Sequence, residues 1–194
     1  GVATQWLQIA KVQANVLNCT PYEDDVVKVI KNWCTEFDVE SDAMHNVFMR
    51  MKTHTGKKPV IMLDAHLDQI ALLVINVEEN GFLRTFPCGG IDRRGIHGTK
   101  VRVLGKDGEY PGIVCSVPPH IKDVNDKNPE RDEIFIDIGF DKEKTEKLVR
   151  MGDRVMLCGK WSDIGNGYVT GPALDDRSGC VTILEALEIL KDKE

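Results

Sequence analysis

Apolar residues recur at helical spacing near the start of the chain. Residues 2–17 and 20–34 each carry an apolar stripe with a period of three to four residues, which predicts two amphipathic helices. The second segment has a start signal, because Thr20 can cap the helix, Pro21 suits its first position and Glu23 completes a capping box. Its predicted inner face consists of Val26, Val29, Ile30 and Trp33.

Two strand-like segments follow these helices. Residues 46–51 have the sequence NVFMRM, and residues 59–66, PVIMLDAH, are apolar at consecutive positions instead of alternate ones. Because a strand covered by helices on both faces has no polar face, this second pattern predicts a buried parallel strand. His66 would then lie at the carboxyl end of that strand, where open α/β sheets bind their ligands.

The pattern changes in the middle of the chain. Short β-rich runs separated by Gly, Pro, Asn and Asp extend to about residue 162, which predicts a small barrel or sandwich. One helix is predicted within this part, over residues 141–152, with Asp141 as its cap and Gly152 as its stop.

Helical spacing returns at the end of the chain through Val181, Leu184, Leu187 and Leu190. The expected fold class is therefore α/β, and the expected organisation is an α/β domain interrupted by a β-rich insert. We expect residues 1–73 to form the first part of the α/β domain, residues 74–162 the insert, and residues 163–194 the continuation of the α/β domain.

Composition restricts the class of protein further. The chain has 194 residues, 42% of them apolar, and this is enough to bury a core in one or two domains. Its net charge of -6, with both signs interspersed, argues against nucleic acid and anionic membranes as partners. No bilayer-spanning run or signal sequence is apparent, and six cysteines without a CxxC pair favour free thiols. These features predict a soluble, cytoplasmic protein.

Two polar side chains interrupt the apolar segment at its end. Residues two apart on a strand point to the same side, so His66 and Asp68 are expected to face one direction together. A carboxylate in this position can orient a histidine that binds a metal ion. The pair alone favours the simpler interpretation, which is a histidine satisfied by a neighbouring acid.

A second cluster of acids precedes the last helix in the sequence GPALDDRSGC. Asp175 and Asp176 both suit a helix N-terminus, and capping is the usual role of such a pair. One cap needs only one carboxylate, and Arg177 could satisfy the other. A carboxylate can alternatively bridge two metal ions.

The order of several separate motifs carries a family resemblance. The segments DAHLDQIALLV, NGFLRTFPCGGIDRRGIHGTKVRV, GIVCSVPPH and GPALDDRSGC together resemble the cytosolic di-metal aminopeptidase family. That family includes glutamyl and deblocking aminopeptidases, TET aminopeptidases and proteins formerly called endoglucanase M. The resemblance implies that His66 is a terminal metal ligand, that Asp68 is a catalytic acid orienting it, and that Asp175 bridges two divalent ions, zinc or cobalt.

The resemblance also implies an architecture and a reaction. It predicts a phosphorylase/peptidase-type α/β catalytic domain, interrupted by a PDZ-like barrel that dimerises and supports a hollow dodecamer. Peptides are the implied substrates, losing their N-terminal amino acids. The family's paired glutamates, a further Asp and a final His follow a helix like the last one here, so we expect this chain alone to bind metal weakly and to be inactive. Glu78 and Glu79 are expected to lie in an exposed turn of the insert and not to replace these glutamates. His97 and His120 also lie in the insert, and a surface or structural role is expected for both.

Two other functions stay open at this point. The chain could be a non-catalytic assembly or binding module with a vestigial metal site. It could also belong to a related di-metal carboxypeptidase or deacylase, because co-catalytic metal folds include both.

Overall fold

The computed structural model describes residues 24–115 and 134–193. The helix predicted over residues 2–17, the capping residues Thr20 to Glu23, and His120 lie outside these ranges. The described residues fall into two compact units, one drawn from Gly1–Gln69 and Gly159–Glu194 and the other from Ile70–Cys158. Each unit is described by itself.

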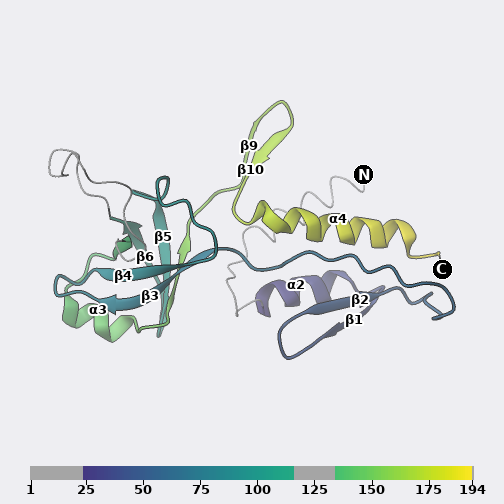
Figure 1. The fold of residues 1–194 in the computed structure, drawn as a ribbon, viewed down its shortest axis with the longest axis horizontal. Coiled ribbons are helices and arrows are strands. Elements are labelled where there is room, and N and C mark those ends of the chain that lie inside the picture. Colours follow the sequence, from purple (N-terminus) through teal and green to yellow (C-terminus); the bar gives the residue numbers. More distant parts are fainter. Residues whose placement is uncertain (1–23, 116–133, 194) are drawn as a thin grey trace. The chain divides into compact units, whose positions relative to one another are not determined.

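The second unit is a closed barrel of antiparallel strands in the order β3-β4-β7-β6-β5-β8. Closure removes the exposed sheet edges on which other chains could pair. The sequence predicted a barrel or sandwich here, and the structure shows a barrel (Figure 1). The strands are β3 (Ala71–Val77), β4 (Leu83–Cys88), β5 (Lys100–Gly105), β6 (Gly108–Val114), β7 (Ile134–Asp137) and β8 (Arg154–Leu157).

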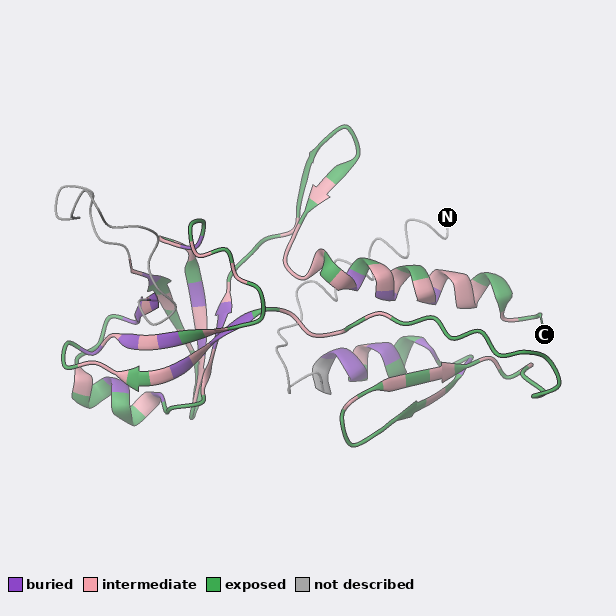
Figure 2. Ribbon diagram, in the orientation of Figure 1, coloured by how far each residue is buried: buried purple, intermediate pink, exposed green. Residues whose placement is uncertain are grey.

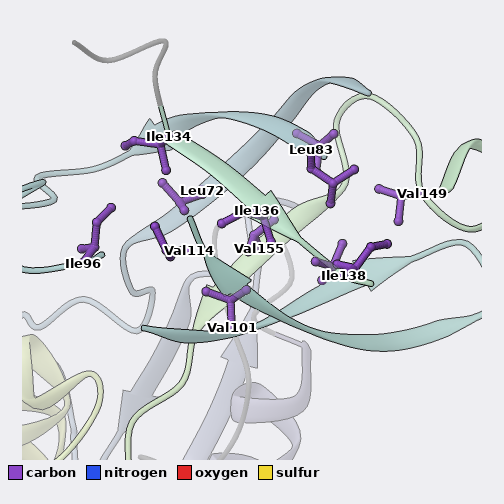
Figure 3. Close-up of a cluster of buried hydrophobic side chains, with 12 residues drawn as sticks. Leu72, Leu83, Ile96, Val101, Val114, Ile134, Ile136, Ile138, Val149 and Val155 are labelled. Atoms are coloured by element: carbon purple, nitrogen blue, oxygen red, sulfur yellow. The ribbon is translucent and has the colours of Figure 1, made fainter. Parts of the chain in front are cut away.

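Aliphatic side chains fill the inside of the barrel (Figure 3). Along β4 and β7, buried positions alternate with more exposed ones, as expected when one face of each strand points inward. Thr85 on β4 is also buried, and its hydroxyl donates to the carbonyl of Ile134 at 2.9 Å. The main buried residues are Leu72, Val74, Leu83, Val101, Val103, Val114, Ile134, Ile136 and Val155.

One helix, α3 (Lys142–Leu148), packs against the barrel unit. Asp141 caps it by accepting a hydrogen bond from the backbone N–H of Lys144 at 2.9 Å, which confirms the predicted cap. The predicted stop at Gly152 was wrong, because the helix ends four residues earlier. Val149 takes an extended conformation there, since its side chain is buried in the barrel core.

The described residues of the first unit form two helices and two β-hairpins. In Figure 1, α2 (Asp24–Trp33) lies beside the hairpin of β1 (Asp38–Ser41) and β2 (Val47–Arg50). A second hairpin, β9 (Ser162–Gly165) with β10 (Tyr168–Thr170), precedes α4 (Leu174–Leu190). Within the two described ranges, no helix combines the length and apolarity that a membrane span requires.

A smaller apolar cluster holds this unit together. It contains Val26, Ile30, Cys34, Phe37 and Leu184, with Leu67 packed against it. Figure 2 shows both buried and exposed residues along α2. The predicted face of α2 was wrong at Trp33, which is 44% exposed. Cys34 is buried instead. The cluster formed with α4 and the first hairpin covers the side of α2 that continues from Val26 and Ile30 to Cys34, and not the side that carries Trp33.

The strand predicted over residues 59–66 was also wrong. These residues are extended, but within the described parts of the chain no strand pairs with them. Their apolar side chains are consequently exposed, with Val60 at 74%, Ile61 at 85% and Met62 at 81%. The apolar pattern indicated a segment that is stable in a strand only when both of its faces are buried. It did not indicate whether other strands lie beside that segment.

We expect the 194-residue polypeptide, expressed alone, to self-associate through this exposed segment. A contiguous apolar segment with unpaired backbone groups promotes association of chains. Sedimentation velocity over a concentration series should show association that a paired Ile61→Lys and Met62→Lys substitution reduces. Ile164→Lys, on the exposed second hairpin, is the matched control. A polypeptide that stays monomeric at every concentration would contradict this expectation.

Candidate functional site

The imidazole of His66 lies between two carboxylates. Its Nε2 is 3.1 Å from Oδ1 of Asp175, although 109 positions separate the two residues. Its Nδ1 is 3.2 Å from Oδ1 of Asp68 and 3.3 Å from the carbonyl oxygen of Asp68. The structure therefore brings together the three residues singled out in the sequence.

The two adjacent acids at the start of α4 have separate contacts. The backbone is non-helical at Asp175 and Asp176, so the regular part of the helix begins at Arg177. Asp176 accepts a hydrogen bond from the backbone N–H of Gly179 at 3.1 Å, as a helix cap does. Glycine suits position 179 because a Cβ would lie 2.5 Å from that carboxylate. The side chain of Asp175 is 96% exposed and meets His66.

The surroundings of His66 act on its pKa in opposite directions. Burial lowers the pKa of the imidazole, whereas the hydrogen bond to Asp175 and the interactions with Asp68 raise it, and the net pKa is above the ordinary value of histidine. A protonated ring donates from both nitrogens to carboxylates. A metal ion would take the place of one of these protons, since only a neutral imidazole nitrogen is a ligand.

Two further residues of α4 hold the backbone beside His66. The Nε of Arg177 donates to the carbonyl of Leu67 at 3.0 Å, and the thiol of Cys180 donates to the carbonyl of His66 at 3.4 Å. Burial raises the pKa of Cys180 to about 11, which keeps this thiol protonated. The sequence suggested one of the neighbouring acids, and not Leu67, as the partner of Arg177. An arginine at the first regular turn of an apolar helix was the only sequence signal for this contact.

The candidate residues of the barrel unit have structural contacts. Glu78 accepts from Arg84 at 2.8 Å, and Glu79 pairs with Lys142. The ring of His97 lies 2.8 Å from the carbonyl oxygen of Cys115. The contact of His97 agrees with the surface or structural role expected for it.

Comparison with known proteins decides the family of the chain. The sequence pattern that defines M42 glutamyl aminopeptidases matches residues 45–194, which include His66, Asp68 and Asp175. The chain belongs to the M42 glutamyl aminopeptidase family. The resemblance noted in the sequence is thereby confirmed.

Relatives of this M42 chain are known in sequence and structure. It is 30% identical to a lysyl aminopeptidase of Pyrococcus furiosus over 178 residues, covering 88% of the chain and 49% of that protein. An aminopeptidase structure from Desulfurococcus kamchatkensis matches 97% of the chain and 53% of its own length, with a TM-score of 0.87 and 32% identity. The TET1 peptidase of Pyrococcus horikoshii, which assembles into a tetrahedron or a large octahedral shell, matches with a TM-score of 0.82, 28% identity, and coverage of 97% and 56%. The chain thus spans about half the length of the relatives it matches.

The donor pair in this M42 chain fits one shared divalent ion. Two ligands each about 2 Å from a tetrahedral ion lie roughly 3.3 Å apart, and the His66 and Asp175 atoms are 3.1 Å apart. Nitrogen and oxygen donors of this kind suit zinc and related ions. Across residues 24–115 and 134–193, no group of three or more His, Cys, Asp and Glu side chains forms a fuller site.

Proposed function

We propose that the intact natural protein carrying this chain is a metal-dependent aminopeptidase that removes N-terminal amino acids from peptides. The observation that carries the proposal is the convergence of His66 and Asp175, at 3.1 Å, within the segment that the family pattern matches. Two divalent ions per site, zinc or cobalt, are part of the proposal. When bound, such an ion supplies Lewis-acid polarisation of the scissile carbonyl.

Each of the three site residues has a distinct role in this proposal. His66 offers Nε2 as a terminal ligand, and Asp68 fixes the ring by holding a proton on Nδ1. Asp175 supplies a carboxylate with room for a second ion, because its side chain is almost fully exposed. The family resemblance assigns the general base to a glutamate that has no counterpart among these residues.

The 194-residue polypeptide by itself should then be a poor enzyme. Two protein donors contact each other at the site, whereas a bound zinc ion takes about four ligands. A general base contributes about 10²- to 10⁴-fold to such reactions. We propose that the polypeptide alone binds metal weakly and does not turn over aminoacyl-anilides.

Assembly and location are further parts of the proposal. The barrel unit would mediate dimers and larger homo-oligomers, as supported by the shells formed by the related peptidase of Pyrococcus horikoshii. The five described cysteines are free thiols, which supports a reducing, cytoplasmic location.

The test compares substrates that differ at their ends. The intact protein, supplied with zinc or cobalt, should release the first residue of a peptide with a free amino terminus, measured by mass spectrometry. It should leave the same peptide untouched when the amino terminus is acetylated. Release from the carboxyl terminus, or removal of the acetyl group, would support a carboxypeptidase or deacylase instead. No hydrolysis of any substrate by a metal-loaded protein would support a non-catalytic assembly module.

A further inference from the structure

The side chain of Arg177 is buried beneath the candidate site. Only 1% of it is exposed, and its Nε donates to the carbonyl of Leu67, the residue between His66 and Asp68. This hydrogen bond fixes the orientation of the peptide group between Leu67 and Asp68, which is part of the backbone that connects the two site residues. A rotation of that peptide group would change the direction of both side chains.

A second contact from the same helix acts on the same segment. Cys180 lies one turn after Arg177, so the two side chains are on one face of α4. Its thiol donates to the carbonyl of His66 at 3.4 Å. A thiol is a weak donor, whereas a guanidinium gives a charge-assisted bond, so Arg177 makes the stronger of the two contacts.

Charge supplies a third link between α4 and the site. Arg177 interacts electrostatically with Asp68, whose carboxylate contacts Nδ1 of His66. A buried guanidinium is costly to desolvate unless acceptors and opposite charge compensate it. One acceptor, the carbonyl of Leu67, and one opposite charge, the carboxylate of Asp68, belong to the segment that carries His66. A displacement of this segment would therefore remove part of the compensation for the buried guanidinium.

The geometry points to Arg177 as a positioning residue that holds residues 66–68 in the conformation in which His66 meets Asp175. The inference deepens the proposed function and rests on it for its catalytic meaning. The effect of Arg177 on the conformation of residues 66–68 does not depend on a bound metal, so it is tested in the metal-free protein.

The experiment uses the intact protein with Arg177→Met, which removes the donor and the charge while keeping a long side chain. The first readout is the NMR spectrum of ring-labelled histidine in the metal-free protein, with the His66 signals assigned through His66→Gln. The second readout is cobalt affinity, measured by titration. We expect altered His66 resonances and cobalt affinity lower by about 10- to 100-fold, the usual effect of losing a residue that supports a ligand. Arg177→Lys should fall between Met and the wild type, because lysine restores a charged donor without the planar fork.

The control for general loss of stability is Ile136→Ala in the barrel unit, which carries none of the site residues. Ile136 packs in the barrel core, so its loss should lower the unfolding midpoint while His66 resonances and cobalt affinity stay at wild-type values. A folded Met or Lys variant with a lowered midpoint, but with wild-type His66 resonances and cobalt affinity, would overturn the proposal. If the wild type neither binds cobalt nor hydrolyses peptides, the proposed function fails, and the spectra of the metal-free variants still decide the role of Arg177.

Discussion

Replacing Asp175 by Asn in the intact protein should lower kcat/KM for a peptide with a free amino terminus by about 10²-fold or more. The amide keeps the size of the side chain but removes the negative charge that two cations would share. Because Asp175 is almost fully exposed, its loss should leave the unfolding midpoint nearly unchanged. Steady-state kinetics at saturating metal, paired with thermal unfolding, measure both effects.

Asp176→Asn is the matched control for this substitution. Asp176 caps the regular part of α4 through the backbone N–H of Gly179, and an asparagine oxygen can accept the same hydrogen bond. Activity should therefore stay close to that of the wild type. Equal losses of activity in the two variants would contradict the separate roles assigned to these adjacent acids.

Replacing Ile136 by Ala should destabilise the barrel unit by about 2 to 5 kcal/mol, the usual cost of truncating a large aliphatic core residue. Ile136 is fully buried in β7, where it packs among the side chains inside the barrel (Figure 3). Truncation would leave a cavity that a closed sheet cannot easily collapse. Hydrogen exchange of peptides from β3 to β8 reports this unit separately from the other one.

Ile113→Ala provides the comparison at the same residue type. Ile113 lies on the adjacent strand β6 and is 44% exposed, so its truncation removes less buried surface. The loss of protection in the barrel peptides should be clearly smaller than for Ile136→Ala. Similar losses would mean that burial does not determine stability in this sheet.

The three side chains of the candidate site could be singled out from the sequence, but the residues that support them could not. The spacing of two residues in an extended segment was enough to predict that His66 and Asp68 lie together. The two adjacent acids before the last helix gave two candidates, Asp175 and Asp176, for one metal ligand. The structure separates that pair, because only Asp176 caps the helix. The contact of Arg177 with the Leu67 carbonyl joins residues 110 positions apart, and no local pattern encodes such a contact.

The fold could be predicted where the segments that pair with each other are neighbours in the sequence. The short β-rich runs between turn residues indicated a barrel or sandwich, and strands adjacent in sequence form part of its pairing, as β3 with β4 and β5 with β6. Residues 59–66 have the composition of a buried strand, but no described strand pairs with them, so they are exposed. Trp33 was misplaced for a related reason, since the cluster that covers α2 comes from distant parts of the chain.

Native mass spectrometry of the intact protein during a zinc titration measures whether His66 and Asp175 hold a shared divalent ion. We expect two zinc ions per wild-type chain and the loss of at least one in both His66→Ala and Asp175→Asn. Two zinc ions bound by both variants, with the affinity of the wild type, would show that these two residues do not share an ion.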